Sequence, residues 1–500
     1  MKKVLTLDGA NLQLNDLKEI LKGDLDIVVE IQDHVKNHIL QSRNTVDMIV
    51  QKKIPIYGIS TGFGKFKEIY IPHQEMVDLQ KNLIISHASC VGEPLKPNIV
   101  LVMMILRLNC LIRGFSGVRM CLIESLQQAI NKKLIPKVPC QGSVGASGDL
   151  APLSHLALGL MGIGEIWIDG QYIDADQALK INDFEPLEYM EKEGLAMNNG
   201  TQMMAAINLE TLMRSQYVMD AADLALGLTS YALQTNYNFL KCHKGNSNKT
   251  LNILSSLIGE TCQEQIKTNP KSIQTAFTTH QIIRQSIEEN LKILEREINS
   301  TSDNPIIDNE RQSARSGGNF HGEYMGMLAD NMCIALQRLC IFSERRQERL
   351  VNSEVGDCGL PMFLTSKGGL LNGYMIPQYT SAALVSENKV LTHPSCIDTV
   401  PTSANIEDHV SMGAYSARKA MQVVSNAEYI IAIELMCAAQ GLEFAKIQLP
   451  PKISSCLKFI RNIIPDVKTQ DIFMNQYIEL MAHNLRHGQI NQLMQELQLL

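Results

Sequence analysis

The stretch GEYMGMLADNMCIALQRLCIFSERRQERL, residues 322–350, contains no proline and repeats its large apolar residues every three or four positions. This spacing places those residues on one face of an α-helix of about eight turns. The face consists of Met325, Leu328, Met332, Leu336 and Leu339. Because the apolar face is wide, we expect the helix to lie inside a bundle of long helices.

Proline distribution extends this prediction along the chain. Proline is absent from Leu187–Asn269, Ile306–Leu360 and Thr402–Leu449. Since proline breaks helix interiors, these segments permit long helices. Residues 278–298 and 414–440 show the same apolar spacing and predict two of them.

Strand signals are few. EIWIDGQYI, residues 165–173, predicts a hairpin that turns at Asp169–Gly170. The predicted fold class is therefore mainly α, with a long-helix bundle core and a smaller mixed N-terminal domain. We expect the N-terminal domain to span residues 1–199 and the bundle, which would also mediate oligomerisation, to span residues 200–500.

Composition excludes several classes of protein. The 500 residues are 45% hydrophobic and 19% charged, with a formal net charge of −7, and no block of Lys and Arg indicates nucleic acid or a membrane surface. The apolar stretch at the N-terminus stops at Asp8, too early for a signal peptide. The 12 cysteines form no CxxC pair, which favours reduced thiols in the cytoplasm. Cys242–His243 has no second ligand pair nearby, so no metal site is expected there.

The segment GSVGASGDLAP, residues 142–152, is dense in small residues. It lacks the Lys of a phosphate-binding Walker loop, and Asp149 stands where a GxSxG nucleophile elbow needs glycine. One interpretation is a glycine-rich turn that leads into a helix, with Asp149 near the helix start and Pro152 in its first turn.

A second interpretation is chemical. In Ala146-Ser147-Gly148 the backbone nitrogen of Gly148 can attack the carbonyl carbon of Ala146, because glycine permits the tight turn that this needs. Loss of water from the ring and from the Ser147 side chain then leaves an exocyclic methylidene, an electrophile built from the chain. The positive end of a helix dipole would favour negative charge on that ring.

At this point the sequence resembles a family, the aromatic amino acid ammonia-lyases that use 4-methylideneimidazol-5-one (MIO), and within it the histidine-specific members most closely. The resemblance covers nearly the whole chain. The similar motifs follow in family order: IYGISTGFGKF (56–66), NLIISHASCVGEPL (82–95), GSVGASGDLAPLSH (142–155), NNGTQ (198–202), SDNP (302–305), GGNFHGE (317–323), SERR (343–346) and TSANIEDHVSMG (402–413).

The resemblance implies a fumarase/aspartase-like ammonia-lyase architecture and an MIO group formed from Ala146-Ser147-Gly148. It implies elimination of ammonia from an aromatic L-amino acid, with L-histidine converted to urocanate. It also implies a homotetramer whose active sites take residues from more than one subunit. No metal and no added cofactor are expected, and no nucleic acid or membrane partner.

Catalytic roles are implied by the same resemblance. Tyr57 is the base that removes the β-proton, and its pKa of ordinarily about 10 is expected to be lowered by its surroundings. Gly58 belongs to a glycine-rich loop expected to close over substrate. Asn199 and Gly200 are expected to donate hydrogen bonds near the MIO carbonyl. Phe320 matches the aromatic residue that packs beside MIO and substrate.

Two residues bear on the choice of substrate. His87 stands where histidine- and tyrosine-specific members have His, and an imidazole there can hydrogen-bond a polar ring. Glu407 resembles the carboxylate of histidine enzymes, which accepts an imidazole N–H. The alternative interpretation of Glu407 is a carboxylate at a helix start.

The chain departs from the family at its carboxylate-binding segment. Counting back from Ser302 through one predicted helix, Lys271 replaces the family's Tyr and Gln274 replaces the Arg that binds the substrate carboxylate. Three explanations remain open. Lys271 binds the substrate carboxylate, another residue such as Arg284 binds it, or the substrate has no free carboxylate.

Other functions remain open on this sequence: a tyrosine ammonia-lyase, an aminomutase, or a lyase for a carboxylate-free substrate. From a different class, a catalytically silent helical binding or assembly protein also remains.

Overall fold

The computed structural model describes residues 3–23, 27–235, 248–258, 269–356 and 359–500. The Cys242–His243 pair lies outside the described residues. Contacts divide the chain into two compact units, each made of separate segments. The first comprises Met1–Glu210, Leu291–Asp330 and Pro394–Lys419; the second comprises Thr211–Asn290, Asn331–His393 and Ala420–Leu500.

This division does not coincide with the predicted boundary after residue 199. It falls within four long helices: α9 (Gln202–Ala232), α13 (Ala276–Ile298), α14 (Glu323–Val351) and α17 (Gly413–Phe444). Helical periodicity predicts where a helix begins and ends, but it does not say which compact unit each part of the helix contacts. The assignment of oligomerisation to residues 200–500 stays a prediction.

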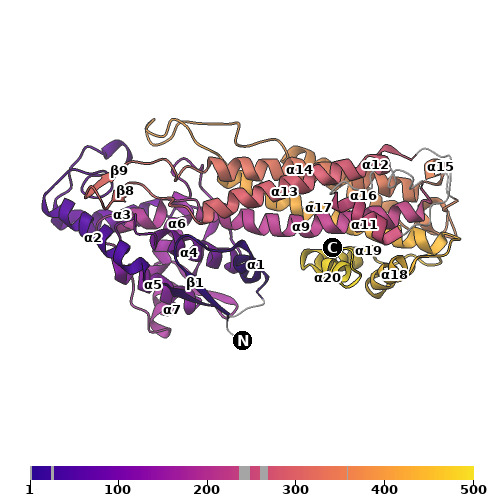
Figure 1. Ribbon diagram of the computed structural model, residues 1–500, viewed down its shortest axis with the longest axis horizontal. Helices are drawn as coiled ribbons and strands as arrows, with labels where there is room; N and C mark the ends of the chain where they lie inside the picture. The colour runs from indigo at the N-terminus through magenta and orange to yellow at the C-terminus, as the bar shows by residue number, and fades with distance from the viewer. Residues whose placement is uncertain (1–2, 24–26, 236–247, 259–268, 357–358) are drawn as a thin grey trace. The chain divides into compact units, whose positions relative to one another are not determined.

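The first unit contains shorter helices around small sheets (Figure 1). Its helices, besides its parts of the four long ones, are α1 (Leu14–Lys22), α2 (Val35–Gln51), α3 (Met76–His87), α4 (Pro97–Leu111), α5 (Met120–Asn131), α6 (Leu150–Leu160), α7 (Ala175–Ile181) and α8 (Glu193–Asn198), with 3₁₀ turns η1 (Gly64–Phe66) and η2 (His73–Glu75). Helix α4 is buried over most of its length and includes two buried polar residues, Arg107 and Asn109.

The strands among the described residues of the first unit form four small sheets. Strands β1 (Lys3–Leu7) and β2 (Ile27–Ile31) form a parallel sheet and pair from Lys3↔Ile27 to Leu7↔Ile31. The other three sheets are antiparallel: β3 (Val91–Pro94) with β5 (Pro139–Gln141), β4 (Ile135–Pro136) with β6 (Glu165–Ile168) and β7 (Gln171–Asp174), and β8 (Ile306–Asp308) with β9 (Ser313–Arg315). The predicted hairpin is confirmed: β6 and β7 pair across Asp169 and Gly170, both at positive φ.

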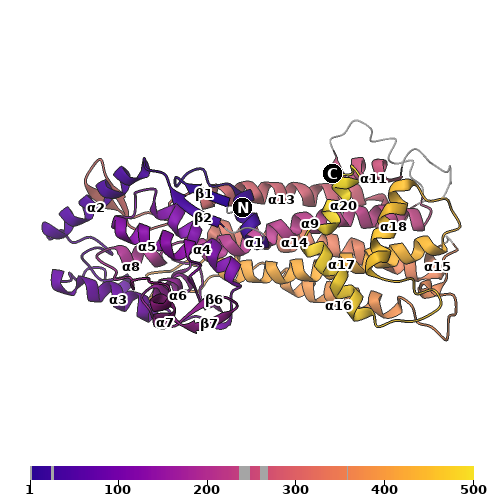
Figure 2. The same cartoon turned by 90° about the horizontal axis from the view of Figure 1, so that it is seen from below.

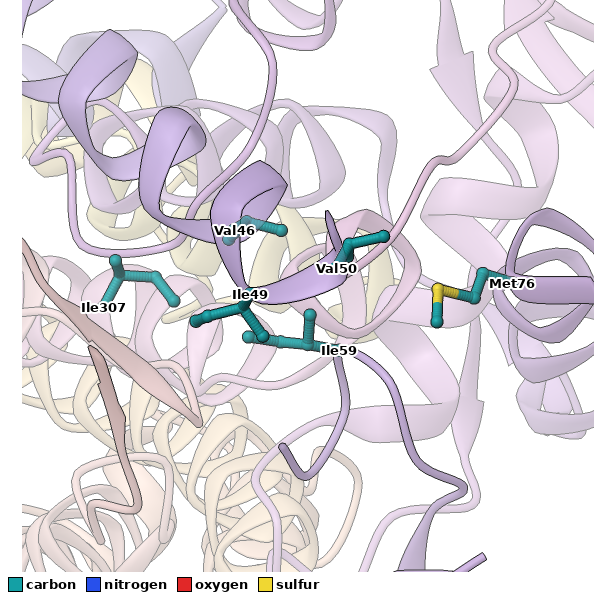
Figure 3. Close-up of a cluster of buried hydrophobic side chains, with 6 residues drawn as sticks. All are labelled: Val46, Ile49, Val50, Ile59, Met76 and Ile307. Carbon is teal, nitrogen blue, oxygen red and sulfur yellow. The ribbon is translucent and has the colours of Figure 1, made fainter. Parts of the chain in front are cut away.

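A hydrophobic cluster supports the loop that carries Tyr57. Figure 3 shows its members, which come from α2, the loop after α2, the start of α3 and β8: Val46, Ile49, Val50, Ile59, Met76 and Ile307. Ile59 is fully buried two residues after Tyr57. The cluster therefore fixes the backbone of this loop on the first unit.

The second unit is helical (Figure 2). It contains its parts of α9, α13, α14 and α17, together with α11 (Lys249–Ile258), α12 (Lys271–Gln274), α15 (Ser353–Gly356), η3 (Met362–Leu364), α16 (Met375–Leu391), α18 (Pro451–Ile463), α19 (Met474–Arg486) and α20 (Gln489–Glu496). Within this unit the four long helices lie side by side (Figures 1 and 2). The prediction of a mainly α fold with long buried helices is confirmed.

Buried ion pairs join the long helices of the second unit. Arg346 of α14 binds Glu434 of α17 through two hydrogen bonds of 2.6 and 2.8 Å, and both side chains are fully buried. Arg214 of α9 likewise forms a bidentate ion pair with Glu428 of α17, with one hydrogen bond to each carboxylate oxygen. Because each charge is paired, the apolar interior of the bundle can hold them.

Helix α14 is the one described helix with the length and hydropathy to cross a membrane. Of its most apolar window, 67% is buried inside the protein. The core helix of a helical bundle has the same combination of length, hydropathy and burial.

Candidate active site

Residues 142–149 form a tight turn between β5 and α6. Gly145 and Gly148 have φ values of +77° and +73° and pair with each other across an isolated antiparallel bridge. The Ser143 hydroxyl accepts a hydrogen bond from the Gly145 N–H at 3.1 Å and donates one to the Gly148 carbonyl at 2.9 Å. The turn that sequence reasoning predicted is therefore present and closed by its own hydrogen bonds.

Gly148 occupies a position that admits no side chain. A Cβ there would lie 2.1 Å from the Gly200 carbonyl oxygen and 2.7 Å from that of Phe320. The N–H of the next residue, Asp149, donates to the same Gly200 oxygen at 2.6 Å. Two distant backbone segments thus close directly on the turn. For Gly200 the contact found is that of an acceptor, and its predicted role as a donor stays a prediction.

Asn199 holds the carbonyl of Ser147. Asn199 follows the end of α8, is 4% exposed, and donates from Nδ2 to the Ser147 oxygen at 3.0 Å. The Asn199 backbone carbonyl accepts a hydrogen bond of 2.9 Å from Nη1 of Arg107, a fully buried side chain of α4. Sequence reasoning missed Arg107, although a lone charge within an apolar helix was an available signal.

Asp149 precedes the first residue of α6, as predicted, but its side chain does not cap that helix. Its Oδ2 accepts from the N–H groups of Met203 at 2.9 Å and Met204 at 3.1 Å, in the first turn of α9. Complete burial raises the pKa of Asp149 to about 7, opposed by these two N–H donors. The carboxylate therefore ties the turn at residues 142–149 to the start of α9.

Glu407 faces the turn from a later segment of the chain. Its Oε1 accepts a hydrogen bond from the Ser147 hydroxyl, and its Oε2 accepts one from the Thr402 hydroxyl at 3.0 Å. Helix α17 begins only at Gly413, so the interpretation of Glu407 as a helix-start carboxylate is wrong. Thr402 is a second contact that sequence reasoning missed.

The segment around Glu407 is anchored to the turn by hydrogen bonds to backbone carbonyls of the turn. The Met412 N–H donates to the Val144 carbonyl at 2.8 Å, and the Ser411 hydroxyl donates to the Gly145 carbonyl at 3.1 Å. The Gly322 N–H, two residues after Phe320, also donates to the Gly145 carbonyl, at 3.0 Å. The half-buried Phe320 thus lies in a segment that contacts the turn through its backbone.

A cavity of about 420 Å³ lies over the turn. It is lined by Ser86, His87, Ser89, Leu150, Ala151, Glu407 and residues 142–148. His87 ends α3, and its Nδ1 lies 3.1 Å from the Ser86 hydroxyl. Burial lowers the pKa of His87 and favours its neutral form. The cavity therefore brings together an imidazole, a carboxylate and the Ala146-Ser147-Gly148 segment.

Tyr57 is half-buried in the loop after α2, with its ring edge-on to Phe63 at 6.3 Å between centroids. Burial raises the pKa of Tyr57, the Gly64 backbone N–H lowers it, and the charge of Glu407 raises it further. The expectation that the surroundings lower this pKa is therefore wrong within this chain, because burial outweighs the hydrogen bond. Gly58 has φ +70°, and a Cβ there would lie 2.3 Å from Leu195.

Lys271 and Gln274 belong to the second unit. Both are exposed on α12, where Lys271 Nζ donates to Gln274 Oε1 at 2.7 Å. Arg284, the other candidate for the substrate carboxylate, is buried and bound to Asp220 at 2.6 Å and Asp223 at 2.5 Å. Its guanidinium is committed to these carboxylates, so Arg284 is excluded from this role.

Comparisons with known proteins agree with this constellation. Residues 12–462 match the family described as aromatic amino acid lyase. A histidine ammonia-lyase of Caenorhabditis elegans is 40% identical over 98% of this chain and 74% of the relative.

Two solved structures extend the likeness over both units. The crystal structure of histidine ammonia-lyase from Trypanosoma cruzi is 37% identical with a TM-score of 0.90, covering 99% of this chain and 96% of that one. Tyrosine aminomutase from Streptomyces globisporus is 28% identical with a TM-score of 0.90, covering 99% of both chains. The chain therefore belongs to the aromatic amino acid lyase family and is a carbon–nitrogen lyase of the ammonia-lyase type.

Proposed function

We propose that the chain eliminates ammonia from L-histidine to give urocanate, using an MIO group formed from Ala146, Ser147 and Gly148. The observation that carries this proposal is the 3.0 Å hydrogen bond from Asn199 Nδ2 to the carbonyl of Ser147, a residue that lines one cavity together with Glu407. The histidine ammonia-lyases among the relatives support the choice of substrate.

The residues present fit the MIO group. If the Gly148 nitrogen closes on the Ala146 carbonyl carbon, the carbonyl that the ring retains is that of Ser147, which Asn199 already contacts. The absence of a Cβ at Gly148 allows the close approach of Gly200. When formed, the group supplies an electron-poor methylidene that makes the substrate's amino group a leaving group. Asn199 then stabilises negative charge on the retained carbonyl.

Glu407 is suited to receive the imidazole of the substrate. In this chain its Oε1 is occupied by the Ser147 hydroxyl, which is the group that dehydration removes. Loss of that hydroxyl leaves Oε1 without its donor, facing the cavity. A substrate imidazole N–H can replace the donor, and Thr402 continues to orient the other oxygen.

His87 and Tyr57 complete the proposed site. A neutral His87, favoured by burial, can hydrogen-bond a polar substrate ring without repelling a protonated one. Tyr57 is the proposed acceptor of the β-proton. The electrostatic influence of Glu407 on Tyr57 supports their proximity. Phe320 is the proposed aromatic wall.

A second candidate rests on the missing carboxylate-binding arginine. With Gln274 in its place and Arg284 committed to Asp220 and Asp223, Lys271 is the proposed carboxylate partner. If Lys271 does not serve, a substrate without a free carboxylate is favoured. The tyrosine aminomutase likeness keeps tyrosine, as substrate of a lyase or an aminomutase, as a further alternative.

The decisive assay follows urocanate absorbance when purified protein meets L-histidine, with Ser147→Ala as control. Urocanate formed by the wild type alone supports the proposal. An intact mass short by two waters, absent in Ser147→Ala, separates a formed MIO group from a catalytically silent binding protein. A dehydrated protein that forms no urocanate overturns histidine as substrate and directs the search to tyrosine and then to carboxylate-free amines.

We further propose that the active form is a homotetramer with shared active sites. Helix α16 of the second unit exposes large apolar side chains, including Ile376 at 53%, Tyr379 at 61% and Val390 at 75%. Such a face favours burial against another subunit. Light scattering on the purified chain tests this, and a monomeric active enzyme would contradict it.

A cytoplasmic location is proposed on cysteine chemistry. The described cysteines are all free thiols, including the exposed Cys121. Free thiols are typical of a reducing compartment.

A further inference from the structure

Three side chains capable of binding a metal meet beside the turn at residues 142–149: His321, Glu323 and His409. One potential ligand atom of each lies within 4.8 Å of the others. In the part of the chain that the structure describes, no other group of three such residues meets this criterion. Sequence reasoning predicted no metal site, and these residues lie in two motifs, with His409 88 positions after His321.

The two imidazoles are spaced like ligands of one ion. Nε2 of His321 lies 3.3 Å from Nδ1 of His409, and the rings stack at 27° with centroids 5.3 Å apart. This separation is at the long end of the range for a hydrogen bond between two ring nitrogens. Two nitrogens bound to a tetrahedral Zn²⁺ at about 2.0–2.1 Å are separated by about 3.3–3.4 Å.

Glu323 supplies the charge that such an ion needs. Its Oε2 is buried, has no hydrogen-bond partner, and lies 3.8 Å from Nδ1 of His321. Because the nitrogen of His321 that faces His409 is Nε2, Glu323 must turn toward the Nε2 side of the ring to share one ion with both imidazoles. A carboxylate oxygen withdrawn from water without a donor is unfavourable, and a cation would satisfy it. The Glu323 side chain is 39% exposed, so it can rotate toward the imidazoles.

The donor set selects the class of ion. Two imidazoles and one carboxylate, with water in the fourth position, match tetrahedral Zn²⁺, whereas Ca²⁺ and Mg²⁺ prefer oxygen ligands throughout. His409 is exposed and His321 and Glu323 are half-buried, which leaves a path for an ion to enter. We propose that His321, Glu323 and His409 bind Zn²⁺.

The bound ion would join two segments that carry proposed site residues. His321 directly follows Phe320, and His409 lies two positions after Glu407. Both segments already contact Gly145 through backbone and side-chain hydrogen bonds. Zn²⁺ is therefore expected to hold these segments together, acting as a positioning element and not on the reacting atoms.

The test is calorimetric titration of the full chain with Zn²⁺ after treatment with chelator. One Zn²⁺ per chain is expected in the wild type. His409→Ala should weaken binding about tenfold or more, and so should Glu323→Gln, which keeps the size of the side chain but removes its charge. Because His409 is exposed, its truncation leaves the packing intact, and circular dichroism verifies the fold.

The chain offers a matched control. His483 of α19 and His487, which directly follows the last residue of that helix, form another close imidazole pair, with centroids 4.2 Å apart. His483→Ala/His487→Ala should retain the Zn²⁺ signal. The proposal is overturned if the wild type binds no Zn²⁺, if His409→Ala and Glu323→Gln bind like the wild type, or if the signal disappears in the α19 variant. These readouts do not depend on ammonia-lyase activity.

Discussion

The Ser147 hydroxyl donates a hydrogen bond to Oε1 of Glu407 across 260 positions of sequence. This contact joins the residue proposed to lose its hydroxyl with the carboxylate proposed to receive the substrate. The same carboxylate oxygen is therefore proposed to accept the Ser147 hydroxyl before dehydration and the substrate imidazole after it.

Glu407→Gln tests this connection. The amide retains an acceptor but loses the charge, and a hydrogen bond to a charged group contributes about 1.5–3 kcal/mol. We expect kcat/KM for L-histidine to fall about 10- to 100-fold while the intact mass still shows two waters lost. Asp408→Asn, a charge loss at the exposed neighbouring residue, should leave kcat/KM unchanged. Loss of the dehydrated mass in Glu407→Gln would instead assign Glu407 to cofactor formation.

Gly148→Ala is expected to prevent ring formation and to destabilise the fold. Its Cβ would lie 2.1 Å from the Gly200 oxygen, in addition to the strain of a side chain at φ +73°. Gly164→Ala is the matched control, because Gly164 has φ +90° but open space around its Cβ position. The control should lose about 1–2 kcal/mol from backbone strain alone. Equal urea midpoints for the two variants would show that the close contact with Gly200 does not contribute to the loss of stability in Gly148→Ala.

Local signals account for the parts of the fold that sequence reasoning predicted. The apolar spacing of residues 322–350 specifies a helix without reference to the rest of the chain, and α14 spans Glu323–Val351. The Asp169–Gly170 turn likewise follows from residues that tolerate positive φ. The tight turn at residues 142–149 follows from the need for glycine at Gly145 and Gly148.

Side-chain partners far apart in sequence were not predictable in this way. Asp149 stands at the start of α6, and nothing near it indicates that its carboxylate binds the first turn of α9. The direction of the Tyr57 pKa was also mispredicted, because burial is a property of the assembled fold. Glu407 was interpreted either as a site residue or as a helix-start carboxylate, and only the position of α17 excludes the helix start.

The raised pKa of Tyr57 predicts that the enzyme is more active at alkaline pH than at neutral pH. If Tyr57 accepts the β-proton, its deprotonated form must be populated, and burial shifts that form to higher pH. We expect kcat to rise with pH above neutrality, and Tyr57→Phe to lose activity while it keeps the dehydrated mass. Phe63→Leu, which changes the ring beside Tyr57 without touching its hydroxyl, should keep the rising profile. A kcat that stays flat between pH 7 and pH 9, about three units to about one unit below the pKa of a free phenol, would exclude Tyr57 as the base.

Asp149 predicts a pH dependence of stability. Its folded pKa, about 7, lies above the ordinary value of 3.8 for an aspartate, so the folded state binds its proton more tightly than the unfolded state. The contribution of Asp149 is therefore largest below pH 3.8 and is lost as the pH rises through about 7. Asp149→Asn keeps an acceptor for Met203 and Met204 but does not titrate. Its stability relative to the wild type should increase by up to about 2 kcal/mol between pH 5 and pH 8 in urea unfolding. A constant difference would show that Asp149 has an ordinary pKa.

The buried pair of Lys192 and Asp303 predicts strongly non-additive mutations. Nζ of Lys192 lies 2.9 and 2.8 Å from the two carboxylate oxygens of Asp303, and both side chains are fully buried. Asp303→Asn leaves a buried cation without its counter-charge and should cost about 3–5 kcal/mol of unfolding free energy. Lys192→Met/Asp303→Leu removes both charges, so it should cost less than Asp303→Asn alone. The exposed pair Lys180–Asp176, 2.5 Å apart, is the control, and Asp176→Asn should leave the free energy of unfolding nearly unchanged. If Lys192→Met/Asp303→Leu is less stable than both Asp303→Asn and Asp176→Asn, the attraction between Lys192 and Asp303 stabilises the first unit. The argument that burying the two charges costs as much as their attraction gains is then wrong for this site.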